Sequence, residues 1–369
     1  MKVLRTISIV IVGALFVFSG TVKGIDPLGS AYKFHDYFHA FGMGALQFMS
    51  LPLSVILCLS EFMTGFSILT GIFRKAGIYG ALVLMLIFTP LTLILALTNP
   101  VSDCGCFGDA VHLSNWQTFG KNLVLLALVV LLFRERRQLE GKAHRKIQFI
   151  IAFLAAICFT GFEIFNLTYL PVVDFLPYSA GTFIPEKMKI PEGAPVTKYE
   201  TTFIYEKDGT RKEFTLKNYP GSDSTWKFIE QRSKLIDKGY MPPIHDFIIT
   251  TADNRNITDS ILASPEPILI MVSKKLGEAD SKRLEKGFET GRKCLSKGIG
   301  FLVLTSSGTE EAASYKNGLL FCLADETTLK TMVRSNPGYL LLRKGKIGGK
   351  WSWANLPDAE TILKTETNK

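Results

Sequence analysis

Charged residues are nearly absent from long stretches of the first 170 residues of this 369-residue chain. The whole sequence has 47% hydrophobic residues, a positive mean hydropathy and a formal net charge of +9. This composition excludes a single ordinary soluble domain. After Phe175 the chain returns to mixed polarity, so we expect a division near residue 172. Internal repeats and low-complexity tracts are also lacking.

The uncharged stretches are long enough, or nearly so, to cross a hydrocarbon core of roughly 30 Å at about 1.5 Å per helical residue. Lys121 makes the fourth stretch the weakest, because its ammonium group must reach a membrane surface or the span must start later. We predict five membrane-spanning helices, at Thr6–Val22, Leu51–Phe73, Ala76–Leu97, Trp116–Phe133 and Ile147–Leu170.

Basic residues are unevenly placed around these stretches. Lysine and arginine are enriched in cytoplasmic loops. They precede the first stretch, fill the turn at Arg74 and Lys75, and crowd the loop before the fifth, whereas none lies between Asn99 and Asn115. We therefore predict a multi-pass protein of a bacterial inner membrane, with a cytoplasmic N-terminus and a periplasmic segment after Leu170, where disulfides persist.

The first stretch lacks a convincing small-x-small cleavage site, which favours a retained span over a signal peptide. The positive charge comes largely from cytoplasmic loops, so we do not expect a nucleic-acid partner. The expected partners are membrane lipid and an extracytoplasmic protein.

Proline recurs through the segment that follows, which is typical of a linker. Asp208 and Gly209 between two β-rich runs predict a hairpin, and "DSTWKFIEQRSKLIDKG" predicts a helix from its capping start and glycine end. From Met241, strands alternate with helices and end in a hairpin plus helix, which predicts a mixed α/β domain. The predicted parts are a four-helix membrane domain (1–135), a basic loop with the fifth span (136–172), a linker with hairpin and helix (173–240), and the α/β domain (241–369).

The segments "PPIHDFIITTADNRNITDSIL" and "NPGYLLLRKGKI" resemble the entry segment and the cis-proline strand of extracytoplasmic thioredoxin-like proteins. The resemblance covers about residues 241–364. It implies that Pro337 is the cis-proline and that the backbone of Asn336 faces a bound peptide.

The catalytic Cys-x-x-Cys of that family would follow the strand "PILIMVS", where this chain reads "SKKLGE". Thiol–disulfide exchange requires a thiolate, so we expect this domain to be redox-silent and to contribute recognition. Cys294 and Cys322 are interpreted as core residues, and a disulfide between them is left open.

The segments "GALFVFSGTVKGIDPLGSAYKF", "SEFMTGFSILTG" and "DCGCFGD" resemble the DoxX and MauE-like family of small membrane proteins. This resemblance implies a four-helix bundle with electron or disulfide traffic at the outer membrane face, including a MauE-like role in maturing partner proteins. The pairing with a thioredoxin-like module also resembles DoxX-type fusion proteins of Bacteroidetes.

Cys104 and Cys106 are separated only by a glycine, so a disulfide between them is reachable, although strained and easily reduced. Such a bond suits transfer of electrons. Asp103 and Asp109 oppose thiol ionisation, and the nearest cation is Lys121. A structural pair and a metal site remain alternatives.

A metal would require His112, or His35 and His39, beside the two thiolates. The segment "YKFHDYFHAFG" is, however, typical of a membrane interface. We therefore predict no metal.

Glu61 lies in the middle of the second span, where a carboxylate is costly. It is either protonated and hydrogen-bonded in a structural role, or it relays protons to a quinone-like acceptor. A quinone is the one cofactor that we consider. Glu163, near the outer end of the fifth span, is a weaker candidate.

The leading hypothesis is a thiol-redox or disulfide-maturation component. In it Cys104 and Cys106 exchange electrons with an extracytoplasmic partner held near Pro337. The alternatives are a non-enzymatic scaffold or assembly factor with a structural cysteine pair, and a quinone-binding or small-molecule-binding bundle that uses Glu61. Whether the chain is an enzyme stays open.

Overall fold

The computed structural model describes residues 2–101, 104–139, 144–195, 198–207, 210–215, 225–237, 239–315 and 318–367. The chain divides into two compact units. Met1–Gly181 and Ile248–Lys369 form the first, and Thr182–Phe247 form the second.

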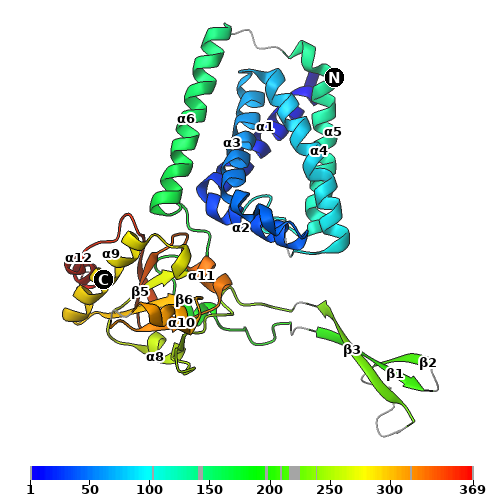
Figure 1. Ribbon diagram of the computed structural model, residues 1–369. Helices are drawn as coiled ribbons and strands as arrows, with labels where there is room; N and C mark the ends of the chain where they lie inside the picture. Colours follow the sequence, from blue (N-terminus) through cyan, green and yellow to red (C-terminus); the bar gives the residue numbers. More distant parts are fainter. Residues whose placement is uncertain are drawn as a thin grey trace. The chain divides into compact units, whose positions relative to one another are not determined.

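Five helices of the first unit are long and apolar enough to cross a membrane. They are α1 (Lys2–Ile25), α3 (Ser50–Thr70), α4 (Arg74–Thr98), α5 (Asn115–Glu135) and α6 (Arg145–Tyr169) (Figure 1). The prediction of a multi-pass membrane protein is confirmed. Shorter helices extend two of these elements: η1 (Gly44–Met49) leads into α3, and η2 (Arg136–Gln138) follows α5.

Helices α1 and α3 cross with their backbones in contact, and glycines allow this approach. A Cβ atom added to Gly65 would lie 2.5 Å from the backbone nitrogen of Val17. One added to Gly20 would lie 2.5 Å from the backbone nitrogen of Phe62. Small residues at helix crossings are the usual device for close packing in a membrane, where apolar burial supplies little drive for association. The crossing therefore depends on these residues having no side chain.

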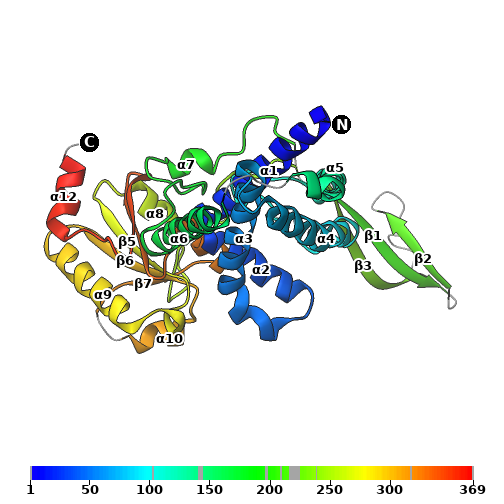
Figure 2. The same ribbon diagram turned by 90° about the horizontal axis from the view of Figure 1, so that it is seen from above.

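The remaining spans pack around this pair (Figure 2). A buried apolar cluster that includes Val12, Ile68, Met85 and Val129 joins α1, α3, α4 and α5. Helix α6 contacts α1 and α3, where the Phe159 ring stacks on Phe62 with ring centroids 4.2 Å apart.

Helix α2 (Pro27–Ala40) follows α1 in the chain and packs on α3. Asp26 caps this helix by accepting a hydrogen bond from the Gly29 N–H. Pro27 at the first helical position suits the start, because its missing N–H would have no partner inside the helix.

The C-terminal part of the first unit is built on a six-stranded sheet with strand order β4-β7-β6-β5-β8-β9. Strands β5, β6 and β7 are parallel, while β8 runs antiparallel to β5 and forms a hairpin with β9. The predicted mixed α/β domain is confirmed. Its strands are β4 (Thr250–Thr251), β5 (Ile268–Ser273), β6 (Gly300–Thr305), β7 (Phe321–Leu323), β8 (Gly338–Arg343) and β9 (Lys346–Ser352).

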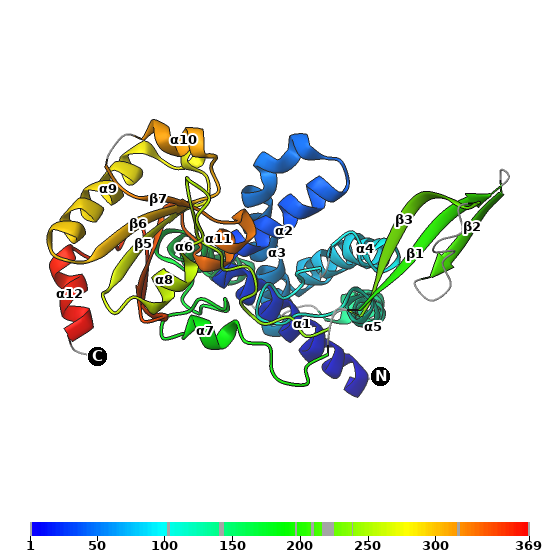
Figure 3. The same cartoon turned by 90° about the horizontal axis from the view of Figure 1, so that it is seen from below.

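Both faces of this sheet are covered, since every residue of β5 is buried. On one face, Met271 and Tyr339 join a core with Phe288 of α9 (Ser281–Ser296) and Ile362 of α12 (Ala359–Thr367) (Figure 3). Four short helices complete the domain: α8 (Thr258–Ala263), η3 (Leu276–Glu278), α10 (Thr309–Ser314) and α11 (Glu326–Met332).

The second unit contains α7 (Ile184–Lys187) and a three-stranded sheet of order β2-β1-β3. Strands β1 (Lys198–Lys207) and β2 (Thr210–Thr215) pair as a hairpin, and the predicted turn residues Asp208 and Gly209 lie outside the described residues. The helix predicted for "DSTWKFIEQRSKLIDKG" is wrong, because Lys227–Asp237 form strand β3. A two-stranded hairpin is marginal by itself, and pairing of β3 along the free edge of β1 overrides the local helix signal.

The glycine crossing gives a testable prediction. Replacing Gly65 by alanine should lower the thermal stability of the detergent-solubilised protein, because overpacking a helix contact costs about 1–3 kcal/mol. Gly161 of α6 has open space around its Cβ position, so Gly161→Ala serves as the matched control. Equal melting temperatures for the two variants would contradict the close crossing.

Candidate functional site

The loop between α4 and α5, here called the cysteine loop (104–114), is fixed at both ends. Asn99 ends α4 in a left-handed conformation, and Ser114 begins α5 with a capping box to Gln117. The Asn115 amide donates hydrogen bonds to the Asn99 side chain and to the carbonyls of Leu95 and Val101. These contacts tie the two helix ends together and present the cysteines in a defined position.

Cys104 and Cys106 lie side by side in this loop, as free thiols with their sulfur atoms 2.6 Å apart. Gly105 between them has φ +62°, and its Cβ position would lie 2.8 Å from the Lys33 side chain. A residue with a side chain would fit neither that backbone conformation nor that space. The structure therefore brings the predicted pair together in a geometry that depends on the glycine.

The two thiols differ in acidity. A hydrogen bond from the Cys106 thiol lowers the pKa of Cys104 to about 6 against the opposing effect of burial, and the Thr118 hydroxyl and the Cys106 N–H contribute further hydrogen bonds. The same sulfur contact, together with burial, raises the pKa of Cys106 well above its usual range. Cys104 is thus the more acidic thiol of the pair.

The expectation that nearby aspartates suppress thiol ionisation is wrong for Cys104. Asp109 does not act as a bare charge, because Arg334 pairs with it at 2.5 Å. Lys121 lies near the cysteine pair, as predicted. Its charge lowers the pKa of Cys104, and its ammonium group lies over the Phe107 ring. Asp103 lies outside the described residues.

Beneath the cysteine loop, α1 and α3 hold a buried ion pair. The Lys23 ammonium group lies 2.6 Å from Glu61 Oε1, and both side chains are no more than 7% exposed. The Ser19 hydroxyl lies 2.8 Å from both Glu61 Oε2 and the Cys106 carbonyl oxygen, and donates its one proton to either acceptor. Glu61 is therefore connected to the loop that carries the thiols.

Lys23 is the residue that sequence reasoning missed. The first predicted span ended at Val22, so Lys23 was placed outside it, but α1 continues to Ile25. The sequence did contain a signal for Lys23: it lies four residues after Ser19, and residues with this spacing share one face of a helix.

A cavity of about 100 Å³ lies between the helices and the cysteine loop. Aromatic and aliphatic side chains form most of its wall, with Lys23, Glu61, Cys104, Cys106 and Lys121 among the lining residues. Such a mostly apolar space with a few convergent polar groups is typical of a small-molecule site.

The residues considered for the alternative of a metal site do not form a cluster in the described segments. Within the described segments, the structure contains no group of three or more histidine, cysteine or acidic side chains suited to a metal ion. His35 and His39 lie on α2 as the helical spacing requires, and Tyr37 of that helix donates a hydrogen bond to the Cys104 carbonyl oxygen.

The six-stranded domain places the other predicted residues at the C-terminal end of β5. The Asn336–Pro337 peptide bond is cis. The Asn336 side chain accepts a hydrogen bond from the Ser273 hydroxyl and donates one to the Lys275 carbonyl. The segment that would hold a Cys-x-x-Cys is therefore adjacent to the cis-proline, but it carries Lys274 and Lys275.

The remaining cysteines and Glu163 lie elsewhere. Cys294 and Cys322 are free and fully buried in the six-stranded domain. Cys58 is buried in α3, and Cys158 is exposed on α6. Glu163 is fully buried in α6, as expected for a carboxylate that faces the bundle rather than lipid.

Comparison with protein families finds a similarity in the membrane part. The family described as methylamine utilisation protein MauE matches residues 1–134. Residues 1–134 are therefore similar to that family and are called the MauE-like domain below. A domain of unknown function (DUF8463) matches residues 199–238, which contain β1, β2 and β3. No curated protein matches the chain.

The domain after the MauE-like part is thioredoxin-like. Its topology supports this: a parallel β5-α9-β6 unit precedes a cis-proline and an antiparallel β8-β9 hairpin. Two solved structures are similar over 33% of this chain. One comes from Bacteroides thetaiotaomicron and is proposed to be a protein disulfide isomerase (17% identity, 84% of that chain, TM-score 0.26). The other is the N-terminal domain of PilB from Neisseria gonorrhoeae (16% identity, 88% of that chain, TM-score 0.25).

The acidity of Cys104 gives a second prediction. In the reduced, solubilised protein, the alkylation rate of Cys104 should rise through about pH 6 and level off above it, whereas an ordinary thiol rises through about pH 8.5. Cys106→Ala removes the strongest hydrogen-bond donor to the Cys104 sulfur and should move this midpoint upward. Cys106→Ser keeps a hydroxyl donor and should move it less. A midpoint near pH 8.5 in the unmodified protein would contradict the lowered pKa of Cys104.

Proposed function

We propose that this chain is a thiol–disulfide exchange component of a bacterial inner membrane, and that its Cys104–Cys106 pair acts on cysteines of an extracytoplasmic protein. The observation that carries the proposal is the asymmetric pair itself. A thiol with a lowered pKa lies beside one with a raised pKa, which is the arrangement of an attacking and a resolving cysteine.

The exchange proceeds in two steps. The Cys104 thiolate attacks one sulfur of a partner disulfide, so that a Cys104–partner bond forms, the partner bond breaks, and the released partner thiolate takes up a proton. Cys106 then loses its proton and attacks Cys104, which forms the Cys104–Cys106 disulfide and releases the second partner thiol. The partner gains two electrons and two protons, and the reverse sequence oxidises a partner dithiol.

The second step needs a proton acceptor, because the pKa of Cys106 is raised. The Lys23–Glu61 pair is available to this end, since Lys23, Glu61 and Cys106 line the same cavity. Glu61 would accept the proton and Lys23 would stabilise the carboxylate between turnovers. Involvement of a quinone in the neighbouring cavity stays a prediction.

Charge placement supports a periplasmic cysteine loop. The ends of α1 and α5 opposite the loop carry Arg5, Arg134, Arg136 and Arg137, and Arg5 pairs with Glu135 there. By the positive-inside rule, this distribution supports a location of the cysteine loop and the thioredoxin-like domain outside the cytoplasm. Peptide binding at Pro337 and Asn336 also stays a prediction.

A trapping experiment tests the exchange. Cys106→Ser should accumulate a mixed disulfide between Cys104 and a partner protein in intact cells, because the resolving thiol is absent. Cys104→Ser should accumulate much less. Non-reducing electrophoresis with mass analysis of the trapped species measures both. If neither variant forms a mixed disulfide, the pair is structural and the chain is better described as a scaffold.

The role of the buried ion pair is tested by removing both charges together. Single removal leaves an uncompensated buried charge and is expected to cost about 3–5 kcal/mol of stability, whereas Lys23→Met with Glu61→Gln leaves none. If Glu61 accepts the Cys106 proton, the double variant should fold and still resolve mixed disulfides more slowly by a factor of about 100. Resolution at the unmodified rate would assign the pair a purely structural role.

A further inference from the structure

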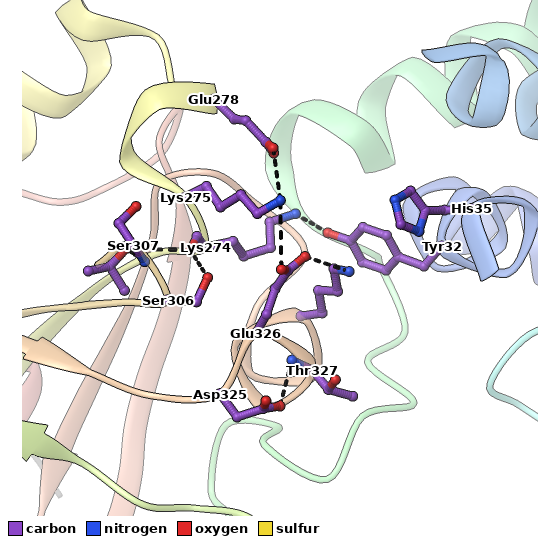
Figure 4. A network of polar contacts seen from close by, with 12 residues as sticks. Tyr32, His35, Lys274, Lys275, Glu278, Ser306, Ser307, Asp325, Glu326 and Thr327 are labelled. Atoms are coloured by element: carbon purple, nitrogen blue, oxygen red, sulfur yellow. Dashed lines mark hydrogen bonds and ion pairs between the residues drawn. The ribbon is translucent and has the colours of Figure 1, made fainter. Parts of the chain in front are cut away.

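The thioredoxin-like domain contacts the MauE-like domain through the face that carries the cis-proline. Three segments make this contact: the turn after β5, which begins at Lys274, helix α11 through Lys330, and the turn between α11 and β8, which contains Arg334. Figure 4 shows Lys274 reaching across to Tyr32 of α2. The contact therefore uses the segment after β5 in which a catalytic thioredoxin-like domain would carry its Cys-x-x-Cys.

Arg334 is the centre of this contact. Its side chain is only 5% exposed and binds two carboxylates of the MauE-like domain. Nε lies 2.7 Å from Asp26 Oδ2, at the start of α2, and Nη2 lies 2.5 Å from Asp109 Oδ2, in the cysteine loop. A planar guanidinium group is suited to hold two carboxylates at fixed positions, which a lysine ammonium group is not.

Tyr32 supports the same contact with its ring. The ring centroid lies 4.6 Å from the Lys274 ammonium group, 5.1 Å from that of Lys330 and 5.2 Å from the Arg334 guanidinium carbon. Burial, with repulsion from Arg334 and Lys330, lowers the pKa of Lys274 to about 8. Three cations gathered on one aromatic ring repel one another, so the contact is stabilised by the carboxylates that Arg334 binds.

The cysteine loop is thus held from two sides. From the bundle, Tyr37 donates a hydrogen bond to the Cys104 carbonyl oxygen, and the Ser19 hydroxyl lies within hydrogen-bond distance of the Cys106 carbonyl oxygen. From the thioredoxin-like domain, Arg334 binds Asp109, three residues after Cys106. Arg334 thus pairs by charge with the cysteine loop from outside the bundle.

We propose that Arg334 is a positioning residue, and that through it the redox-silent thioredoxin-like domain clamps the cysteine loop and limits access to Cys104 and Cys106. The clamp would regulate the thiol–disulfide exchange proposed above, and its biological purpose rests on that proposed function. A partner gains full access to the pair when the bond between Arg334 and Asp109 opens.

The test measures how fast each cysteine of the full-length protein reacts in isolated membranes. After mild reduction, a membrane-impermeant maleimide is added and each cysteine-containing peptide is quantified by mass spectrometry. Arg334→Gln and Asp109→Asn break the same bond from its two ends. Both should speed the reaction of Cys104 and Cys106 severalfold.

The chain supplies its own controls. Cys294 and Cys322 are fully buried in the thioredoxin-like domain, so they should stay unreactive if the clamp opens and the domain remains folded. Arg283→Gln removes one positive charge from a different place in that domain, where the guanidinium group stacks on Trp353, and should leave the pair unchanged. Asp26→Asn keeps the helix cap and the bond from Arg334 to Asp109, and should have much the smaller effect.

Three results would overturn the clamp. The first is that Cys104 and Cys106 react at the unmodified rate, or more slowly, in both Arg334→Gln and Asp109→Asn. The second is that Cys294 and Cys322 become reactive together with the pair, which would report unfolding. The third is that Asp26→Asn speeds the reaction as much as Asp109→Asn does. Where Arg334→Gln does not accumulate in membranes, Asp109→Asn, which leaves the thioredoxin-like domain unaltered, decides the question.

This experiment is independent of the trapping experiment. Selective exposure of the pair without any mixed disulfide would support the clamp and contradict thiol exchange. A mixed disulfide with no selective exposure would support exchange and contradict the clamp.

Discussion

The close crossing of α1 and α3 is the constraint on which the cysteine site depends. Because glycines line the crossing, the backbones meet and the Lys23 ammonium group reaches Glu61 within 2.6 Å. A buried ion pair offsets its desolvation cost only when the geometry is good and further hydrogen bonds are made, and Ser19 provides one. The same crossing brings Ser19 under the Cys106 carbonyl. The packing of two helices thus sets both the charge balance of the bundle and the support of the loop above it.

The local environment of Cys104 illustrates why charge counted along a sequence is a poor guide to thiol acidity. Acidic neighbours in the sequence suggested a thiol that resists ionisation. In the folded chain, the Cys104 sulfur makes hydrogen bonds with the Cys106 thiol and the Thr118 hydroxyl, and it accepts one from the Cys106 N–H. The Asp109 charge is met by Arg334. Short-range hydrogen bonds therefore decide the acidity, and the aspartate serves to attach a second domain.

Much of the architecture could be predicted from local pattern. Hydropathy located the five spans, alternation of strands and helices predicted the α/β domain, and the resemblance at "NPGYLLL" indicated that Pro337 is cis. The partners of buried charges could not be predicted, because they lie far apart in the sequence. Arg334 is separated from Asp109 by 225 residues and from Asp26 by 308. Strand β3 was missed for a related reason, since pairing with β1 outweighs the helical signal of its own sequence.

The lysines after β5 also bear on how many electrons the proposed exchange can store in one molecule. The chain has six cysteines, of which Cys58 and Cys158 lie within spans and Cys294 and Cys322 are buried in the thioredoxin-like core. With Lys274 and Lys275 in place of a second pair, the proposed exchange has no second disulfide in the thioredoxin-like domain to pass electrons to. It would then store one electron pair in each molecule, at the cysteine loop. Each turnover of the proposed exchange would be completed with another molecule before the next could begin.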